Sequence, residues 1–305
     1  MRVLVATEKP FAAEAVNNIR SIIENAGFEL VLLEKYTDKS QLLAAVSDVE
    51  AAIVRSDIFD EEVLNAGKKL RIVVRAGAGY DNVNLTAATA NNIVVMNTPG
   101  QNSNAVAELA IGMALFAFRN QFDGTSGGEL YGKKIGIHAF GNVGRNLARI
   151  AKGFNMDVFA STRSISAETL AKDGITKVES VAELYKTCQV VSVHVPANEQ
   201  TKKMVNYDLL IQMPKNAILI NTARKEVIDE EGLAKVMEER PDFKYVTDIK
   251  PDNHDEMVEK FSKRYFSTPK KMGAQTAEAN INAGVAAAKQ IVDFLKNGNE
   301  TFKVN

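Results

Sequence analysis

The sequence predicts an α/β protein made of two doubly wound domains, each built on a parallel sheet. Short apolar runs rich in Val, Ile and Leu alternate with segments of helical spacing along the whole chain. Strands that are separated by helices pair in parallel through right-handed crossovers. The length of 305 residues fits two domains, and 46% hydrophobic residues are enough for two cores.

The predicted strands fall into two groups. The first group comprises 2–6, 29–33, 51–55, 71–75 and 93–96, and the second comprises 134–139, 156–160, 189–195, 216–220 and 244–248. The predicted helices between them include 11–25, 142–153, 180–187 and 229–239.

Two long helical segments mark the predicted domain boundaries. Residues 102–122 form an apolar-periodic helix that leads from the first strand group to the second, and the turn-rich DGTSGG follows at 123–128. Residues 275–296 form a further alanine-rich helix, which we expect to pack against the first group. The sequence therefore predicts a discontinuous, flavodoxin-like domain of residues 1–98 plus 277–305, a Rossmann domain of residues 99–276, and a cleft between them.

The bulk composition excludes several functions. A formal net charge of −1 provides no general attraction to nucleic acid or to an anionic membrane. The single cysteine, Cys188, rules out an intrachain disulfide, and the histidines lack metal-ligand spacing, so no metal is expected. No apolar run is long enough to span a bilayer, and the first residues enter a strand without a signal-peptide pattern. We expect a cytoplasmic protein.

The sharpest local signal is a dinucleotide-binding turn. The segment KIGIHAFGNVG at 134–144 runs from an apolar strand through a glycine-bearing turn into the helix at 145–152. Backbone N–H groups at such a helix start, together with the helix dipole, suit a pyrophosphate. The first glycine of the usual G-x-G-x-x-G pattern is replaced by Ala139. The predicted cofactor-binding residues of the turn are Gly141, Asn142, Val143 and Gly144.

The end of the next strand addresses the choice between NAD and NADP. An NAD site usually has Asp or Glu here to accept from the ribose 2′-hydroxyl, whereas this chain has Ser161, Thr162 and Arg163. These two hydroxyl groups and the cation of Arg163 could contact a 2′-phosphate, or Arg163 could be a solvated loop residue. NAD is the expected cofactor, with NADP possible.

Three further motifs carry a family resemblance. They are RAGAGYDN at 75–82, NTPGQNSNAVAE at 97–108, and INTARKEVIDEEG at 220–232 with a strand that ends in Asp248. With the dinucleotide turn, they resemble the D-isomer-specific 2-hydroxy acid dehydrogenases over almost the whole chain. The resemblance implies hydride transfer between a small 2-hydroxy acid and a nicotinamide cofactor, in a homodimer. The chain is most similar to the short family members that lack regulatory domains and act on 3-phosphoglycerate or 3-phosphohydroxypyruvate, in the first step of phosphorylated L-serine biosynthesis.

The resemblance also assigns site residues. Arg224 matches the catalytic arginine, whose planar guanidinium binds the substrate carboxylate and polarises the keto oxygen. Gly77 and Ala78 match the loop that offers backbone N–H groups to that carboxylate, and Asn102 and Ser103 match the helix start that lines the cleft. The remaining cofactor-binding assignments are His194, Pro196, Thr222 and Asp248.

Two arginines favour a phosphorylated substrate. Arg55 and Arg75 stand at the carboxyl ends of predicted strands, where ligands bind in open parallel sheets. Both match positions at which the phosphoglycerate-specific members contact the substrate phosphate. Two cations at one site are hard to explain for lactate or formate, although either alone could be a surface ion-pair residue.

The chain departs from the family at the catalytic histidine. The corresponding segment reads STPKKMGAQT at 267–276, and alignment on its Gly-Ala-x-Thr places Lys271 at the histidine position, with Lys270 as an extra residue. The partner glutamate is also missing, and Asp252 is the nearest carboxylate. A histidine needs a carboxylate to fix its tautomer, whereas a lysine does not, so the histidine and the glutamate can be lost together. In this respect the chain resembles a lysine-using subgroup.

The three histidines do not replace the missing residue. We expect His138 to be packed inside its strand, His194 to face the cofactor, and His254 to be solvated in an acidic loop. Two alternative functions stay open: a glyoxylate or hydroxypyruvate reductase of the same fold, and a non-catalytic, cofactor-sensing binding protein.

Overall fold

The computed structural model describes residues 1–305 and divides them into two compact units. Unit 1 comprises Met1–Asn102 and Gln275–Asn305, and unit 2 comprises Ser103–Ala274. The chain therefore passes between the units after Asn102 and after Ala274. No helix combines the length and hydrophobicity needed to cross a membrane.

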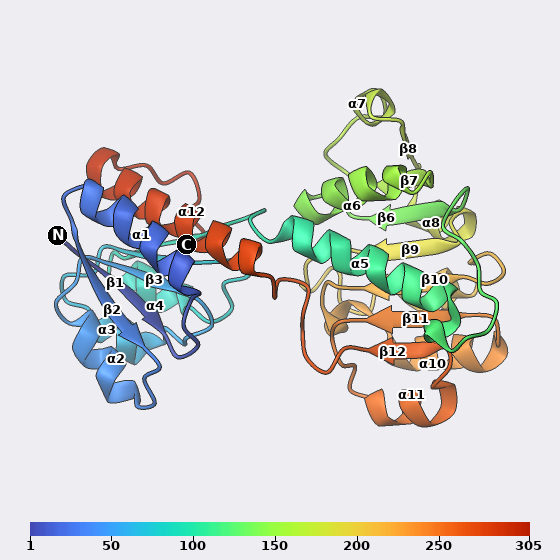
Figure 1. The fold of residues 1–305 in the computed structure, drawn as a ribbon, viewed down its shortest axis with the longest axis horizontal. Coiled ribbons are helices and arrows are strands. Elements are labelled where there is room, and N and C mark those ends of the chain that lie inside the picture. Colours follow the sequence, from blue (N-terminus) through green and yellow to red (C-terminus); the bar gives the residue numbers. More distant parts are fainter. The chain divides into compact units, whose positions relative to one another are not determined.

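Unit 1 is built on a five-stranded parallel sheet (Figure 1). The strand order β2-β1-β3-β4-β5 is that of flavodoxin-like folds, which confirms the prediction for this domain. In this order β1 and β3 are neighbours whose connections leave on opposite faces of the sheet, and ligands bind at their carboxyl ends. The strands are β1 (Arg2–Thr7), β2 (Glu29–Glu34), β3 (Ala51–Val54), β4 (Ile72–Arg75) and β5 (Val94–Asn97).

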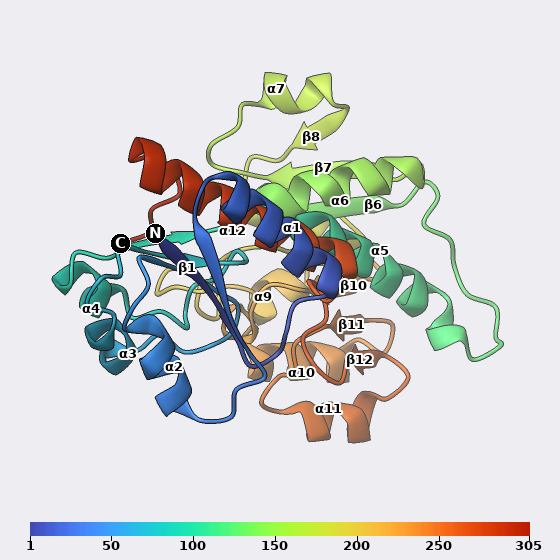
Figure 2. The ribbon, with the colours of Figure 1, turned by 60° about the vertical axis from the view of Figure 1, so that its left-hand side comes forward.

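Helices cover both faces of this sheet because successive strand residues point to opposite sides. Val3 and Val5 of β1 face the core under α1 (Ala13–Asn25) and α12 (Ala277–Asn297), whereas Leu4 and Ala6 face the core under the other helices. Those other helices are α2 (Lys39–Val46), α3 (Glu61–Ala66) and α4 (Leu85–Ala90). Helices α1 and α12 lie side by side (Figures 1 and 2).

Unit 2 contains a seven-stranded parallel sheet in the order β12-β11-β10-β9-β6-β7-β8. Numbered along the unit, the order contains the Rossmann arrangement 3-2-1-4-5-6, which confirms the predicted fold class. The strands are β6 (Lys134–His138), β7 (Asp157–Ser161), β8 (Ile175–Lys177), β9 (Val190–Val193), β10 (Ile218–Asn221), β11 (Lys244–Thr247) and β12 (Tyr265–Ser267). Strands β8 and β12 were not predicted from the sequence.

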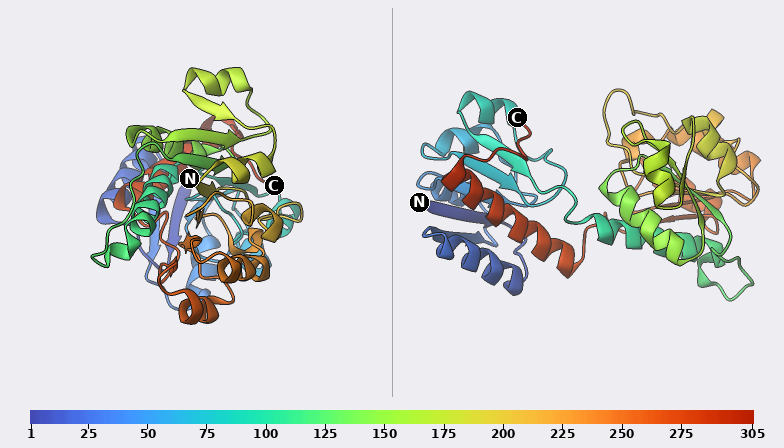
Figure 3. Two further views of the ribbon diagram at one scale, coloured as in Figure 1. Left: turned by 90° about the vertical axis from the view of Figure 1, so that its right-hand side faces the viewer. Right: turned by 90° about the horizontal axis from the view of Figure 1, so that it is seen from above.

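Helices also lie on both faces of the second sheet (Figure 3). One core contains residues of α5 (Ser103–Phe118), α6 (Asn142–Gly153) and α7 (Ala167–Lys172). The other contains residues of α8 (Val181–Thr187), α9 (Tyr207–Leu210), α10 (Glu230–Glu239) and α11 (His254–Phe261), together with η2 (Lys225–Val227).

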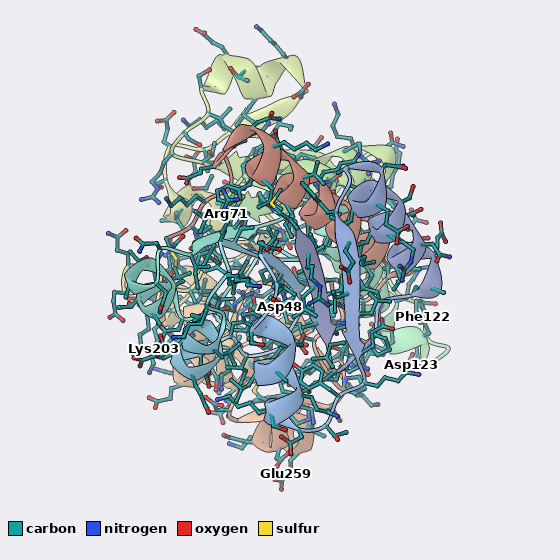
Figure 4. All side chains as sticks on the ribbon, turned by 90° about the vertical axis from the view of Figure 1, so that its left-hand side faces the viewer. Asp48, Arg71, Phe122, Asp123, Lys203 and Glu259 are labelled. Carbon is teal, nitrogen blue, oxygen red and sulfur yellow. The ribbon has the colours of Figure 1, made fainter.

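Two local predictions were wrong. The helix expected over 102–122 ends at Phe118, because Asn120, Gln121 and Phe122 have φ values of 49°, 58° and 58°. The Nζ of Lys244 holds this left-handed turn, η1 (Asn120–Phe122), by donating to Ala117 O at 2.7 Å and to Asn120 Oδ1 at 2.9 Å. Figure 4 shows Phe122 and the adjoining Asp123 at an outer edge of unit 2.

The second error concerns His254. It begins helix α11 instead of lying in a loop, and it is half-buried instead of solvated. Its Nδ1 lies 2.7 Å from the hydroxyl of Tyr265, the first residue of β12.

Candidate active site

The predicted dinucleotide turn joins β6 to α6 at the carboxyl edge of the sheet in unit 2. Gly141 is the N-cap of α6, and no side chain caps the helix there. A Cβ at Gly141 would meet nothing within 4 Å, so there is free space beside this residue. An uncapped helix N-terminus with free space before it is suited to an anion such as pyrophosphate.

The other two positions of the turn are constrained by close packing. A Cβ at Gly144 would lie 2.8 Å from Ala139 O and 2.9 Å from Ile137 Cγ2, so only glycine allows α6 to approach β6 this closely. Ala139 has φ 78°, which is the left-handed conformation that glycine adopts at low cost. The turn therefore keeps the backbone geometry of a G-x-G-x-x-G motif although Ala139 replaces its first glycine.

Two histidines lie beneath this turn at the ends of neighbouring strands. Nδ1 of His138 lies 3.0 Å from the hydroxyl of Tyr185, and burial lowers the pKa of His138 to about 4. Nε2 of His194 lies 2.9 Å from Oγ of Ser192. Burial and the neighbouring His138 lower the pKa of His194 to about 3. Both imidazoles are therefore neutral at pH 7, and neither is suited to accept a proton there.

Two buried polar atoms without partners lie after β10 and β11. They are Oγ1 of Thr222 and Oδ1 of Asp248, both predicted cofactor contacts. The other carboxylate oxygen of Asp248 accepts from the N–H groups of Met272 at 3.2 Å and Gly273 at 2.7 Å, and burial raises the pKa of Asp248. Since buried polar groups nearly always have partners, these atoms indicate a place for a polar ligand. The residues present thus fit a bound dinucleotide.

Arg224 and Lys271 are brought together in the same unit. Nη1 of Arg224 donates to Ala223 O at 2.8 Å, and Nζ of Lys271 donates to the same oxygen at 3.3 Å. Asn221 holds the loop, because its amide accepts from Ala223 N at 3.0 Å and donates to Arg224 O at 3.0 Å. Asn221 was not identified from the sequence. The geometry places a guanidinium and an ammonium group within reach of one small anionic substrate.

The carboxylate nearest in sequence to the missing glutamate lies elsewhere. Asp252 forms an exposed ion pair with Lys225 at 2.5 Å. Lys270 and Lys271 are both exposed, but the extra lysine, Lys270, donates no side-chain bond to Ala223. The segment after β7 offers no carboxylate to a ribose hydroxyl, because no Asp or Glu occurs between 161 and 167. In this segment Thr162 is half-buried and Arg163 is exposed.

In unit 1, the two predicted phosphate-binding arginines are neighbours. Nε of Arg75 donates to Arg55 O at 2.9 Å. The guanidinium of Arg55 donates to Asn280 Oδ1 at 2.6 Å and lies 5.1 Å from the centre of the Phe11 ring. Burial lowers the pKa of Arg55, so an anionic ligand would supply a favourable counter-charge. Asn280, in the first turn of α12, is a further site residue that sequence reasoning missed.

The loop after β4 is shaped around Arg75. Gly77 has φ 153°, and a Cβ there would lie 1.6 Å from Nη1 of Arg75. The N–H of Gly77 donates to Arg75 O at 2.8 Å, so it is already used inside the loop. The N–H groups that the loop can offer to a ligand are therefore those of Ala78 and Gly79.

The last two predicted substrate contacts are consecutive residues at the point where the chain leaves unit 1 and enters unit 2. Asn102 ends the first segment of unit 1, and Ser103 begins α5 in unit 2. Oγ of Ser103 accepts from Nδ2 of Asn146, on α6, at 3.0 Å. Pro196 is exposed in the loop that follows His194.

A Rossmann sheet whose first helix has an uncapped N-terminus is the architecture of dinucleotide-binding proteins. Within that class, the chain belongs to the D-isomer specific 2-hydroxyacid dehydrogenases, because residues 112–265 match the family's NAD binding domain. This confirms the family resemblance read from the sequence motifs.

Several characterised proteins are similar to the chain. D-3-phosphoglycerate dehydrogenase of Methanocaldococcus jannaschii is 31% identical over 275 residues, which cover 85% of this chain and 52% of that protein. The chain thus spans about half the length of this curated relative. Hydroxypyruvate reductase of Thermotoga maritima is 31% identical over 88% of this chain and 92% of its own.

A solved structure extends the similarity over the full chain. The NAD+-bound 3-phosphoglycerate dehydrogenase of Entamoeba histolytica is 47% identical and has a TM-score of 0.89. The match covers 100% of this chain and 98% of that one.

Proposed function

We propose that the chain is a nicotinamide-dependent dehydrogenase that interconverts 3-phosphoglycerate and 3-phosphohydroxypyruvate, in the first step of phosphorylated serine biosynthesis. The observation that carries the proposal is the pair Arg55 and Arg75, joined at the carboxyl edge of the sheet in unit 1. A single carboxylate needs one guanidinium, whereas a phosphate monoester adds a second, doubly charged group. The similarity to phosphoglycerate dehydrogenases supports the same substrate.

NAD is the proposed cofactor, and its nicotinamide ring, when bound, accepts or supplies the hydride. The first turn of α6 would hold the pyrophosphate, and Thr222 and Asp248 would supply the partners that their buried oxygens lack. Arg224 would bind the substrate carboxylate and stabilise negative charge on the reacting oxygen. Lys271 would donate a proton to that oxygen during reduction and accept it during oxidation.

A hydroxypyruvate reductase is the second candidate function. The similarity to the Thermotoga maritima enzyme over 92% of that protein favours it. Hydroxypyruvate lacks the phosphate, so it could not make the contacts that we propose for the phosphate with Arg55 and Arg75. We further propose a homodimer, as the family resemblance implies. We also propose a cytoplasmic protein that binds no nucleic acid, in line with its formal net charge of −1.

The arginine pair provides the test of the substrate. We expect Arg75→Ala, like Arg55→Ala, to raise the KM for 3-phosphohydroxypyruvate about 10- to 100-fold, which corresponds to about 1.5–3 kcal/mol for a charge-assisted hydrogen bond. The KM for hydroxypyruvate should change little. The matched control is Arg71→Ala, since Arg71 (labelled in Figure 4) is exposed just before the amino end of the same strand. Equal losses on both substrates would contradict the phosphate assignment.

A further inference from the structure

The loop between Arg75 and Tyr80 contains two successive peptide groups with N–H groups that point the same way. The carbonyl of Gly77 accepts from the N–H of Thr98 at 3.0 Å, and the carbonyl of Ala78 accepts from Nδ2 of Asn97 at 2.6 Å. In a planar trans peptide the N–H points opposite to the carbonyl. The N–H groups of Ala78 and Gly79 are therefore both directed away from the end of β5.

Successive N–H groups on one side of a loop form a concavity that binds anions. Neither N–H donates to another group of unit 1. The two N–H groups are thus oriented by the hydrogen bonds that the carbonyl groups of the same peptides accept. One of these hydrogen bonds comes from the main chain and the other from a side chain. The Gly77 carbonyl is held by the main chain of Thr98, whereas the Ala78 carbonyl is held by the side chain of Asn97.

Asn97 is itself fixed from a distant part of the sequence. It is the last residue of β5, and its carbonyl accepts from Nε2 of Gln290, on α12, at 3.0 Å. The oxygen of the same Gln290 amide is buried without a partner, so the amide is directed by this one bond. The side chain of Asn97 therefore projects from a backbone position that the helix holds in place.

We propose that Asn97 is a positioning residue that aims the Gly79 N–H, and with it the N–H pair of the loop, at the carboxylate of the substrate. This inference rests on the proposed 2-hydroxy acid dehydrogenase function. It concerns the carboxylate, which 3-phosphohydroxypyruvate and hydroxypyruvate share, and not the phosphate. The effect of losing Asn97 is therefore distinct from that of losing Arg75.

The test compares Asn97→Ala with the wild-type enzyme on both keto acids, with NADH in excess. Without the amide donor, the Ala78–Gly79 peptide is free to rotate, and we expect KM to rise about tenfold for both substrates alike. We expect kcat to change less than threefold, because Arg224 and Lys271 are untouched. The Kd of NADH, followed by fluorescence titration, and the Tm should match those of the wild type.

Asn25→Ala is the control, since it removes an exposed asparagine bond of the same unit, from Nδ2 to Ser21 Oγ at 3.3 Å. It should leave both KM values unchanged. Asn97→Asp keeps the size but places an acceptor against the Ala78 carbonyl, so it should weaken binding at least as much as Asn97→Ala.

Three results would overturn the inference. They are unchanged KM values in Asn97→Ala, a loss confined to the phosphorylated substrate, and a fall in Tm that accounts for the loss of activity. If the wild-type enzyme turns over neither keto acid, the proposed function fails and this inference fails with it. If the wild type turns over both and Asn97→Ala equals it, only the role of Asn97 is refuted.

Discussion

Replacing Lys271 with alanine should separate proton transfer from substrate binding. The Lys271 ammonium and the Arg224 guanidinium both donate to Ala223 O, at 3.3 and 2.8 Å, so the two cationic groups lie close together, and we propose that both face the same part of a bound keto acid. In the proposed mechanism, Arg224 stays in place in the variant and still binds the carboxylate. The variant lacks the proposed general acid, and such a group typically contributes about 10²- to 10⁴-fold to the rate. We therefore expect kcat to fall by that factor, or about 3–5 kcal/mol in activation free energy, with a small change in KM.

The assay follows NADH absorbance during reduction of 3-phosphohydroxypyruvate. In the opposite direction, the wild-type rate should rise toward alkaline pH, because an ammonium group must lose its proton before it can accept one. The Kd of NADH should be unchanged in Lys271→Ala, since the dinucleotide turn is formed by β6 and α6. Lys270→Ala is the matched control, because both lysines are exposed and Lys271, not Lys270, donates to Ala223 O.

Two results would refute this reasoning. A large loss in Lys270→Ala with a mild one in Lys271→Ala would mean that the alignment is shifted by one residue. Mild effects in both variants would remove lysine from the proton path.

Three further predictions concern the Rossmann unit. Ala139→Gly should remove the strain of a left-handed non-glycine residue, which costs the folded state about 1–2 kcal/mol. The glycine also raises the conformational entropy of the unfolded chain, which lowers the stability by about 0.4–1 kcal/mol. The variant's free energy of unfolding in urea should thus rise slightly, and a loss above about 1 kcal/mol would contradict the strain argument. The pKa of His138 is lowered to about 4 from 6.5, so its contribution to stability is complete above pH 6.5 and is lost as pH falls toward 4. That loss is about 3 kcal/mol by pH 4. The variant His138→Gln keeps a partner for Tyr185, and its free energy of unfolding in urea should depend less on pH between 6.5 and 4 than that of the wild type. An equal pH dependence in the variant and the wild type would refute this prediction. Arg163→Asp should strengthen the preference for NADH over NADPH, measured as a ratio of kcat/KM values; the prediction is wrong if the wild type already discriminates by more than about a thousandfold.

The fold could be predicted from the sequence where local signals are long or strongly apolar. The strand segments of β1 and β9 are buried nearly throughout, and such runs between helices allow few topologies. Strands β8 and β12 have only three residues each, with partly exposed patterns, so they carry no comparable signal. The end of α5 was misplaced because tertiary bonds from Lys244 stabilise a left-handed turn that local propensity disfavours.

The candidate site divides in a similar way. Arg224 and Lys271 could be named from motifs, because each motif fixes a loop relative to its strand. Both residues contact Ala223 O, but Lys271 is 48 residues away from Ala223 in the sequence, so no local pattern predicts this contact. The contacts of Arg55 with Asn280 and of Gln290 with Asn97 span 225 and 193 residues. Such partners depend on the register in which α12 packs in unit 1; the sequence predicted the packing of this helix but not its register.

The most direct test of the proposed function is the substrate preference of the purified wild-type chain. Reduction of 3-phosphohydroxypyruvate and of hydroxypyruvate by NADH should be measured under identical conditions as kcat/KM. If both arginines contact the phosphate as proposed, the enzyme should prefer the phosphorylated substrate by at least about a hundredfold, at about 1.4 kcal/mol per factor of ten. Equal values, or a preference for hydroxypyruvate, would contradict the assignment of Arg55 and Arg75 and would favour a hydroxypyruvate reductase.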